Sequence, residues 1–321
     1  MIHEGIGGYF EMELPDYGGF LHDDGVLLNS GRNALEYVLR SLPNVNHLWI
    51  PYYTCDVILE PIKKIDITYS FYRIDERLEI RDSFELRDGD FLLYTNYFGI
   101  KDCYVRQLAE KYGIRLIVDN AQAWYADPIP GISTIYSPRK YVGIPDGGIA
   151  YCPSGIDVEQ FERDDSHERC SHLLKRIDLG PSVGYLDYRE NSKSLVNQPI
   201  RRMSRLTDRM LRAIDFDSIK QKRWKNFLYL EKGLKEENQL SFAELSSIQC
   251  PMVYPFLSKD TSLKELLIKN RVFVATYWPN IFEWDKPSNW EYQLAKDLVC
   301  LPVDQRYGER EMNEVIDQIK H

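Results

Sequence analysis

Short apolar runs alternate with stretches of helical periodicity through the first two thirds of the chain. The apolar runs are rich in β-branched and aromatic residues, and they predict buried strands over 47–53, 67–74, 90–99, 114–122 and 147–152. Between them, apolar residues recur at helical spacing over 105–113, and Gly113 ends that pattern. Strands that alternate with helices predict an α/β domain with a mainly parallel sheet.

The pattern changes in the last third of the chain. Residues 199–234 have helical periodicity, and we expect the helix around 219–234 to lead into a smaller α+β domain. The strands and the last helix expected there cover 249–257, 272–279 and 309–320. We therefore expect a large α/β domain over 1–215 and a small C-terminal α+β domain over 216–321.

Composition limits the class of protein. The chain has 321 residues, 44% hydrophobic and 13% aromatic, which is enough for a packed core. Its net charge of −9 does not favour a nucleic-acid partner. No apolar run approaches the length of a membrane span, and the first residues lack the basic and apolar regions of a signal peptide. We expect a cytoplasmic protein with no membrane partner.

Cysteine and histidine give no sign of a metal or redox site. The six cysteines form no C-x-x-C pair, and the six histidines form no cluster with metal-ligand spacing. The basic stretch 201–212 is interpreted as the solvated face of a helix. No G-x-S-x-G string supports a serine nucleophile.

The first chemical signal is the string "SGRNAL" at 30–35. Ser30 can cap a helix that starts at about Arg32, and Gly31 lets a ligand approach the backbone. The free N–H groups and the dipole of a helix N-terminus suit phosphate. An ordinary capped helix that binds nothing explains the same residues.

The second signal is "VDNAQAW" at 118–124. Asp119 comes at the end of a buried apolar strand, where ligands bind in open α/β sheets. Its carboxylate can stay ionised against a buried cation such as a protonated ring nitrogen. The alternative is an acidic cap of the next turn.

The third signal is "YSPRKYVGIPDGG" at 136–148, which holds Lys140 between Ser-Pro and Gly-Gly. A lysine that a tight loop removes from water has a depressed pKa and readily forms an imine. The alternative is a solvated loop lysine.

Together, these three signals supply what pyridoxal 5'-phosphate (PLP) requires. Its phosphate needs donors, its pyridinium needs an anion and its aldehyde needs an amine. Their order resembles the fold type I PLP-dependent transferases and, more narrowly, the DegT-like sugar-nucleotide aminotransferase family. The resemblance covers most of the chain and passes through "SGRNAL", "IPYYTC", "YTNYFG", "VDNAQAW", "YSPRKYVGIPDGG", "ATYWP" and "LPVDQRY".

The resemblance implies a role for each matching residue. Lys140 would carry PLP as an imine, Asp119 would pair with the pyridine nitrogen, and Gln122 would contact the face or the phenolic oxygen of the cofactor. The residues implied at or near the phosphate are Gly31, Arg32, Asn33, Ser137 and Asn96.

The chain departs from the family pattern at three places. Arg32 stands where the family commonly has threonine, and its charge could pair with the phosphate. Cys55 stands where an aromatic residue usually stacks on the cofactor ring, so Tyr52 or Tyr53 would have to substitute. The loop that the family contributes across its dimer interface has its best candidate in 184–192.

The resemblance implies an aminotransferase that moves an amino group, expected from glutamate, to a keto sugar nucleotide in polysaccharide or amino-sugar biosynthesis. It also implies a homodimer. One alternative is a sugar dehydratase of the same fold, a branch that has histidine in place of the imine lysine. Another is a non-catalytic relative that binds PLP or a sugar nucleotide.

Overall fold

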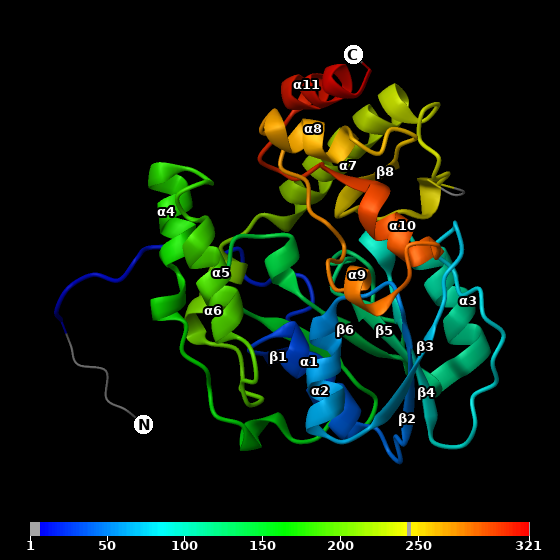
Figure 1. Cartoon of the computed structure of the whole chain (residues 1–321). Helices are drawn as coiled ribbons and strands as arrows, with labels where there is room; N and C mark the ends of the chain where they lie inside the picture. Colours follow the sequence, from blue (N-terminus) through cyan, green and yellow to red (C-terminus); the bar gives the residue numbers. More distant parts are fainter. Residues whose placement is uncertain (1–6, 243–244, 321) are drawn as a thin grey trace.

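The computed structural model describes residues 7–242 and 245–320 (Figure 1). Its main element is a seven-stranded sheet with the strand order β1-β7-β6-β5-β4-β2-β3. The strands are β1 (Val26–Leu28), β2 (His47–Pro51), β3 (Thr68–Tyr72), β4 (Asp90–Thr95), β5 (Leu116–Asn120), β6 (Ser133–Tyr136) and β7 (Gly148–Tyr151). Strands β2 to β6 are parallel, while β7 runs antiparallel to both β6 and β1. The prediction of an α/β fold with a mainly parallel sheet is confirmed.

Helices cover both faces of this sheet, which explains why β4 and β5 are buried along their whole length. On one face, Ile117 packs in a cluster with residues of α1 (Gly31–Ser41) and α2 (Leu59–Lys64). On the other face, the neighbouring Val118 packs in a cluster with residues of α3 (Asp102–Tyr112) and α6 (Arg205–Arg212). Successive residues of one strand therefore pack into two different cores, because their side chains point to opposite faces of the sheet.

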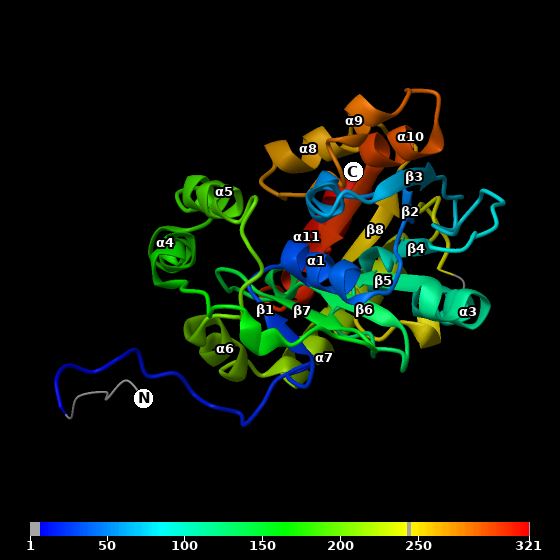
Figure 2. The same ribbon diagram turned by 90° about the horizontal axis from the view of Figure 1, so that it is seen from below.

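Helices α4 (Ser171–Leu179) and α5 (Tyr185–Ser194) lie side by side at one edge of the molecule (Figures 1 and 2). The candidate cross-subunit stretch 184–192 is therefore mainly helical and not a loop. Its buried Asn191 donates from Nδ2 to the carbonyl of Pro145 at 2.7 Å, which ties α5 to the segment before β7.

The C-terminal part has a core of its own around the antiparallel pair β8 (Val253–Leu257) and β9 (Leu298–Pro302). Its helices are α7 (Phe216–Leu234), α8 (Leu263–Lys269), α9 (Ile281–Trp284), α10 (Trp290–Asp297) and α11 (Glu309–Lys320). The boundary predicted between residues 215 and 216 falls just before α7. The division into two domains stays a prediction.

Two predicted elements differ in the structure. The helical stretch 199–234 is split into α6 and α7, because Asp215 accepts the N–H of Ser218 at 2.9 Å and starts a new helix. The strand predicted over 272–279 is wrong, since this segment meets β9 only through the bridge between Ala275 and Cys300. Its strand-like pattern reflects a buried anchor, Trp278, which packs into the core of the main sheet.

No helix in the described part of the chain is both long enough and apolar enough to cross a bilayer.

Candidate active site

The start of α1 lies against the segment that carries Lys140. Ser30 caps the helix by accepting the N–H of Asn33 at 3.1 Å. A side-chain carbon added at Gly31 would lie 3.3 Å from Cβ of Ser137, so only a glycine lets these two segments approach freely. The structure thus brings together two stretches that are about a hundred residues apart, as the phosphate hypothesis requires.

Lys140 ends a single 3-10 turn, Pro138–Lys140, that directly follows β6. Its side chain is exposed and is not removed from water as the tight loop predicted, and its amine forms no ion pair or hydrogen bond with the residues that the structure describes. Its positive charge lowers the pKa of both Asp119 and Cys55 against the larger, raising effect of their burial. The amine therefore lies near both groups and is free to react.

Asp119 lies at the carboxyl end of β5 and is 7% exposed. Burial raises the pKa of its carboxyl, whereas Lys140 and a hydrogen bond from the N–H of Ala121 lower it. That N–H lies 2.9 Å from Oδ1. A carboxylate with so little water benefits strongly from a nearby cation.

Gln122 and Thr95 present uncommitted polar atoms beside Asp119. Gln122 is fully buried, and its Oε1 accepts the N–H of Phe98 at 3.1 Å. Its Nε2 has no hydrogen-bond partner among the described residues, and neither has the buried hydroxyl of Thr95, whose backbone is in register with Asp119. Buried donors are normally paired, so these two atoms are available to a ligand beside Asp119.

Two guanidinium groups gather near the start of α1. Nη2 of Arg139 and Nε of Arg32 are buried and have no hydrogen-bond partner in the described part of the chain. Burial lowers the pKa of Arg139, and so do the charges of Arg32 and Arg169, although Tyr188 and Asp146 raise it. This surplus of positive charge and free N–H groups suits a phosphate dianion.

The surrounding acidic groups do not use up these donors. Glu60 lies 3.4 Å from Nε of Arg32, close enough for an ion pair but without hydrogen-bond geometry. Arg169 already pairs with Asp146 at 2.7 Å and Asp164 at 2.6 Å. Arg169 keeps one unpaired donor, its Nε, in addition to those of Arg32 and Arg139.

Two residues from the predicted site set are occupied elsewhere. The amide nitrogen of Asn33 donates to Asn29 at 2.9 Å and to the carbonyl of Pro199 at 2.5 Å. The amide nitrogen of Asn96 donates to the carboxylate of Asp102 at 2.7 Å. Both amides hold loops in place, and the one unpaired atom, Oδ1 of Asn33, is an acceptor that cannot bind a phosphate oxygen.

Tyr52 and Tyr53, the two residues expected to replace Cys55 as a stacking platform, are both packed against other rings. Tyr53 is fully buried and packs edge-on against Trp278, with ring centroids 5.1 Å apart. Tyr52 stacks on Phe71 with ring centroids 4.5 Å apart. The partly buried thiol of Cys55, which is within the electrostatic reach of Lys140, remains the residue at this position.

Four residues near the site were missed by the sequence reasoning. Thr95 ends a fully buried strand just as Asp119 does, and Arg139 is the cation next to Lys140, so the sequence contained a signal for both. Tyr188 of α5 lies with its ring 5.7 Å from the guanidinium of Arg139. Tyr277, from the C-terminal part, has its pKa raised by burial and also by Tyr188 and Cys55, so it lies near both. Both tyrosines lie in stretches that the sequence analysis quoted, 184–192 and "ATYWP", but neither was given a role.

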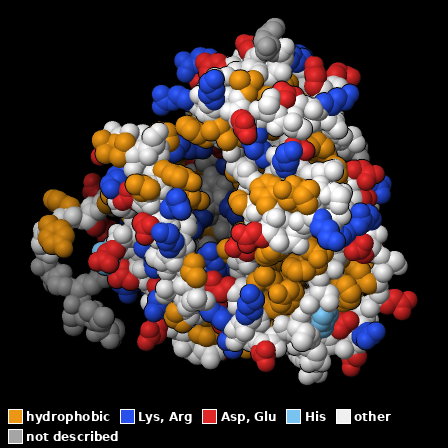
Figure 3. All heavy atoms as spheres, viewed as in Figure 1, with side chains coloured by type: hydrophobic (Ala, Val, Ile, Leu, Met, Phe, Trp, Pro, Cys, Tyr) orange, Lys and Arg blue, Asp and Glu red, His pale blue; other side chains and the backbone are white. Residues whose placement is uncertain are grey.

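The surface over this region is open. Figure 3 shows a hollow between the side of α4 and α5 and the side of α9, and Lys and Arg side chains gather at it. Within the described ranges, no group of three or more His, Cys, Asp and Glu side chains is placed to hold a metal ion. The chemistry available here is that of an amine, a buried acid and an anion site.

Comparison by sequence finds no match, either to a protein-family model or to a curated protein. Comparison by structure finds many similar folds. Spr1654 from Streptococcus pneumoniae, described as a proposed sugar aminotransferase and solved in its PLP form, is 16% identical. It matches with a TM-score of 0.63 over 94% of this chain and 88% of that chain.

Two further structures have the same fold. DesI, solved in the presence of its TDP-sugar product, is 15% identical and has a TM-score of 0.62 over 92% of this chain and 79% of its own. The sugar aminotransferase CalS13 from Micromonospora echinospora is 16% identical and has a TM-score of 0.59 over 92% of this chain and 86% of its own. The chain therefore has the fold that these proteins share.

Proposed function

We propose that this chain is a PLP-dependent aminotransferase of the DegT-like family and that it acts on a keto sugar nucleotide. One observation carries the proposal. An uncommitted lysine amine lies near a buried carboxylate, in a site whose adjacent helix start has surplus guanidinium N–H groups. The shared fold with sugar aminotransferases supports the same conclusion.

The residues present fit PLP. The start of α1, the guanidinium groups of Arg32 and Arg139 and the hydroxyl of Ser137 would hold its phosphate. Asp119 would face the ring nitrogen. The unpaired Nε2 of Gln122 is a donor suited to the phenolic oxygen.

PLP, when bound, supplies an electron sink and a carrier for the amino group. Lys140 would bind its aldehyde carbon through Nζ. The same Nζ atom would move the proton that amino transfer requires. Asp119 would keep the proton on the ring nitrogen, and Tyr277 and Cys55 would border the reacting face.

The proposed substrates are a keto sugar nucleotide and an amino-acid donor, expected to be glutamate. The Lys and Arg side chains at the hollow suit the phosphates of a nucleotide (Figure 3). The TDP-sugar in the DesI structure of the same fold supports this substrate class. A cytoplasmic role in polysaccharide or amino-sugar biosynthesis is part of the proposal.

The test compares Lys140→Ala with Lys63→Ala, which removes an exposed lysine of α2. Each protein is incubated with PLP, reduced with borohydride, digested and analysed by mass spectrometry. We expect PLP on the peptide that contains residue 140 in the wild type and in Lys63→Ala, and no labelled peptide in Lys140→Ala. Labelling at another lysine would overturn the site.

Activity is then measured with glutamate and a panel of keto sugar nucleotides. Amino transfer by the wild type and Lys63→Ala, and its loss in Lys140→Ala, is the expected result. PLP binding without transfer to any member of the panel would favour the non-catalytic alternative. Loss of water from the sugar without amino transfer would favour the dehydratase.

A further inference from the structure

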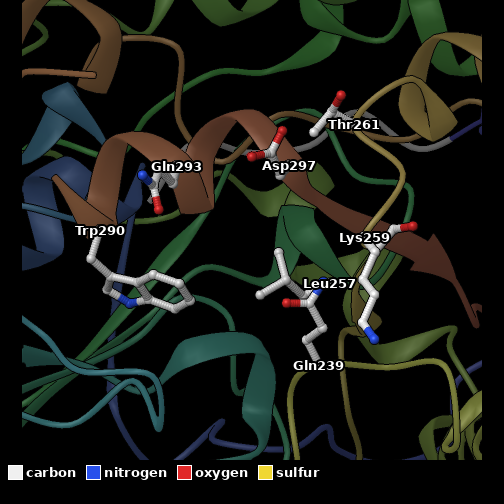
Figure 4. Close-up of a pocket in the computed structure, with 8 residues that line it drawn as sticks. Gln239, Leu257, Lys259, Thr261, Trp290, Gln293 and Asp297 are labelled. Atoms are coloured by element: carbon white, nitrogen blue, oxygen red, sulfur yellow. The ribbon is translucent and has the colours of Figure 1, made fainter. Parts of the chain in front are cut away.

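A second pocket lies in the C-terminal part of the chain, and none of its residues belongs to the group around Lys140. Its volume is about 300 Å³, at the lower end of the range for small-ligand sites. The residues that line it are Gln239, Leu257, Ser258, Lys259, Thr261, Trp290, Gln293 and Asp297. We call it the Trp290 pocket (Figure 4).

Three separate segments fix the walls of the Trp290 pocket. Leu257 at the end of β8 pairs with Leu298 at the start of β9, which directly follows Asp297. Gln239 is held against the same strand end, because its N–H donates to the carbonyl of Leu257 at 3.0 Å. The pocket is therefore built on strand and helix ends and does not depend on one loop alone.

Trp290 forms an aromatic wall with a fixed orientation. Its Nε1 donates to the carbonyl of Asp75 at 3.1 Å, so the edge of the indole is anchored while the residue remains partly exposed. Figure 4 shows the ring at one side of the pocket, with Gln293 close to it. A flat, anchored ring of this kind offers a stacking surface.

The remaining walls are polar and largely uncommitted. Oδ1 of Asp297 is buried and has no hydrogen-bond partner among the described residues. The carboxylate also belongs to the last residue of α10, where the helix dipole disfavours a negative charge. Asp297 lines the pocket, and its carboxylate can accept a hydrogen bond from a ligand there.

Other side chains can give and receive hydrogen bonds around that acceptor. Within the described ranges, the side chains of Gln239, Gln293 and Thr261 form no hydrogen bond with another residue, and Lys259 forms no ion pair. Ser258 is committed, since its hydroxyl accepts the N–H of Asp260 at 2.9 Å. The side-chain amides of the two glutamines and the hydroxyl of Thr261 can each both donate and accept a hydrogen bond.

This combination selects one class of ligand. One lysine and one aspartate give the lining no net charge, which disfavours an isolated phosphate. A single aliphatic side chain, Leu257, cannot hold a lipid tail, and a single carboxylate cannot hold a metal ion. A pyranose ring has a C–H face that stacks on an indole, and it has hydroxyls that both donate and accept.

We propose that the Trp290 pocket binds a neutral pyranose unit at a site separate from the active site. The C–H face of the sugar stacks on Trp290, one hydroxyl donates to the carboxylate of Asp297, and Gln239 and Gln293 bind the hydroxyls at the rim. The pyranose can come from a free sugar or from the end of a glycan, since both present the same ring.

Saturation-transfer NMR on the full chain tests the proposal with two sets of probes, methyl pyranosides and short linear oligosaccharides. We expect transfer from the protein to the C–H protons of at least one probe. Asp297→Asn and Gln293→Ala are expected to weaken its affinity by about tenfold. Both variants are expected to fold, because Gln293 is exposed and Asp297→Asn keeps the shape of the side chain. Phe282→Ala is the matched control, since it removes an exposed aromatic residue of α9 that does not line the pocket.

The outcomes separate the possibilities. Binding that is lost in the two pocket variants and kept in Phe282→Ala supports the proposal, and the better probe set identifies a free sugar or a glycan end as the source. Binding that is unchanged in Asp297→Asn and Gln293→Ala overturns it, because the sugar then binds elsewhere, including the active site. The absence of saturation transfer to every probe at about 10 mM also overturns the proposal.

Discussion

Asp119 combines a charge with almost complete removal from water, which is a costly arrangement unless a cation is supplied. In the proposed site that cation is the protonated ring nitrogen of PLP. Asp119→Asn keeps an oxygen for the N–H of Ala121 but loses the charge. We expect amino transfer to slow by roughly 10²–10³-fold, the range for loss of one preorganised electrostatic group.

The measurement is single-turnover kinetics of the Asp119→Asn protein with glutamate, with circular dichroism as the check on folding. PLP content is measured in the same samples, so that a loss of cofactor is not mistaken for a slower proton transfer. Near-normal turnover in a folded, PLP-loaded variant would contradict the role of Asp119.

Cys55 predicts weak retention of the cofactor. A thiol cannot stack on a ring as an aromatic side chain does, and Tyr52 and Tyr53 are both occupied elsewhere. Cys55→Phe is expected to tighten PLP binding by about 0.5–1.5 kcal/mol. Titration of the PLP-free protein, followed by absorbance, measures this change.

Cys55→Ala is the matched control for that titration, because it removes the thiol without adding a ring. It should bind PLP no more tightly than the wild type does. Weaker binding by Cys55→Phe would mean that the pocket has no room for a ring, and the vacant-platform interpretation would then fail.

The junction between α1 and β7 depends on Gly148. A side-chain carbon there would lie 2.1 Å from the carbonyl oxygen of Ser30, which is backbone and cannot move away cheaply. Gly148→Ala is therefore expected to lower the free energy of unfolding by about 3 kcal/mol, at the upper end for overpacked positions. It should also weaken PLP binding, since Ser30 begins the helix proposed to hold the phosphate.

Gly143→Ala, in the segment that leads into β7, provides the control. Its added carbon would meet only Cδ2 of Leu173 at 3.5 Å, an ordinary contact. Urea unfolding of both variants measures the difference. Equal stability of the two variants would contradict the close approach of Ser30 to β7.

At the scale of helices and strands, the sequence predicted those elements whose apolar residues recur at a regular interval. Strands β2 to β5 and β7 and helices α1, α3 and α11 lie where their apolar patterns predict them. The pattern failed over 272–279, where an aromatic anchor is buried in a distant core and its spacing imitates a strand. It also gave no helix for α5, whose polar and apolar residues are not segregated to opposite faces.

The candidate site shows the same limit. Strand-end logic found Asp119 from local sequence, and it would have found Thr95 as well. The side-chain hydrogen bonds of Asn33 and Asn96 could not be predicted, because their partners, such as Pro199 and Asp102, come near only in the folded chain. The contributions of Tyr188 and Tyr277 likewise depend on packing between segments about ninety residues apart.

At the scale of the whole molecule, the α4–α5 hairpin exposes an apolar surface beside the proposed site. Its exposed apolar residues, together with one just beyond α5, are Leu174, Ile177, Leu179, Val183, Tyr185, Leu186, Tyr188 and Val196. A patch of this kind next to Arg139 fits the homodimer that the family resemblance implies. We expect sedimentation to show a dimer for the wild type.

Ile177→Asp in the hairpin should shift the protein toward a monomer and lower PLP retention. Leu266→Asp, which replaces an exposed apolar residue on α8, should leave the dimer intact. A wild-type monomer that binds PLP and is active would contradict the dimer.

The guanidinium groups of Arg32 and Arg139 at the start of α1 have a consequence for the amount of this protein in a cell. The charge of Arg32 lowers the pKa of Arg139, so an anion bound between these two cations stabilises the fold by mass action. Chains that open more often are degraded more quickly. With PLP as the resident anion, the supply of vitamin B6 would therefore govern how much of this protein accumulates as well as how much of it is active.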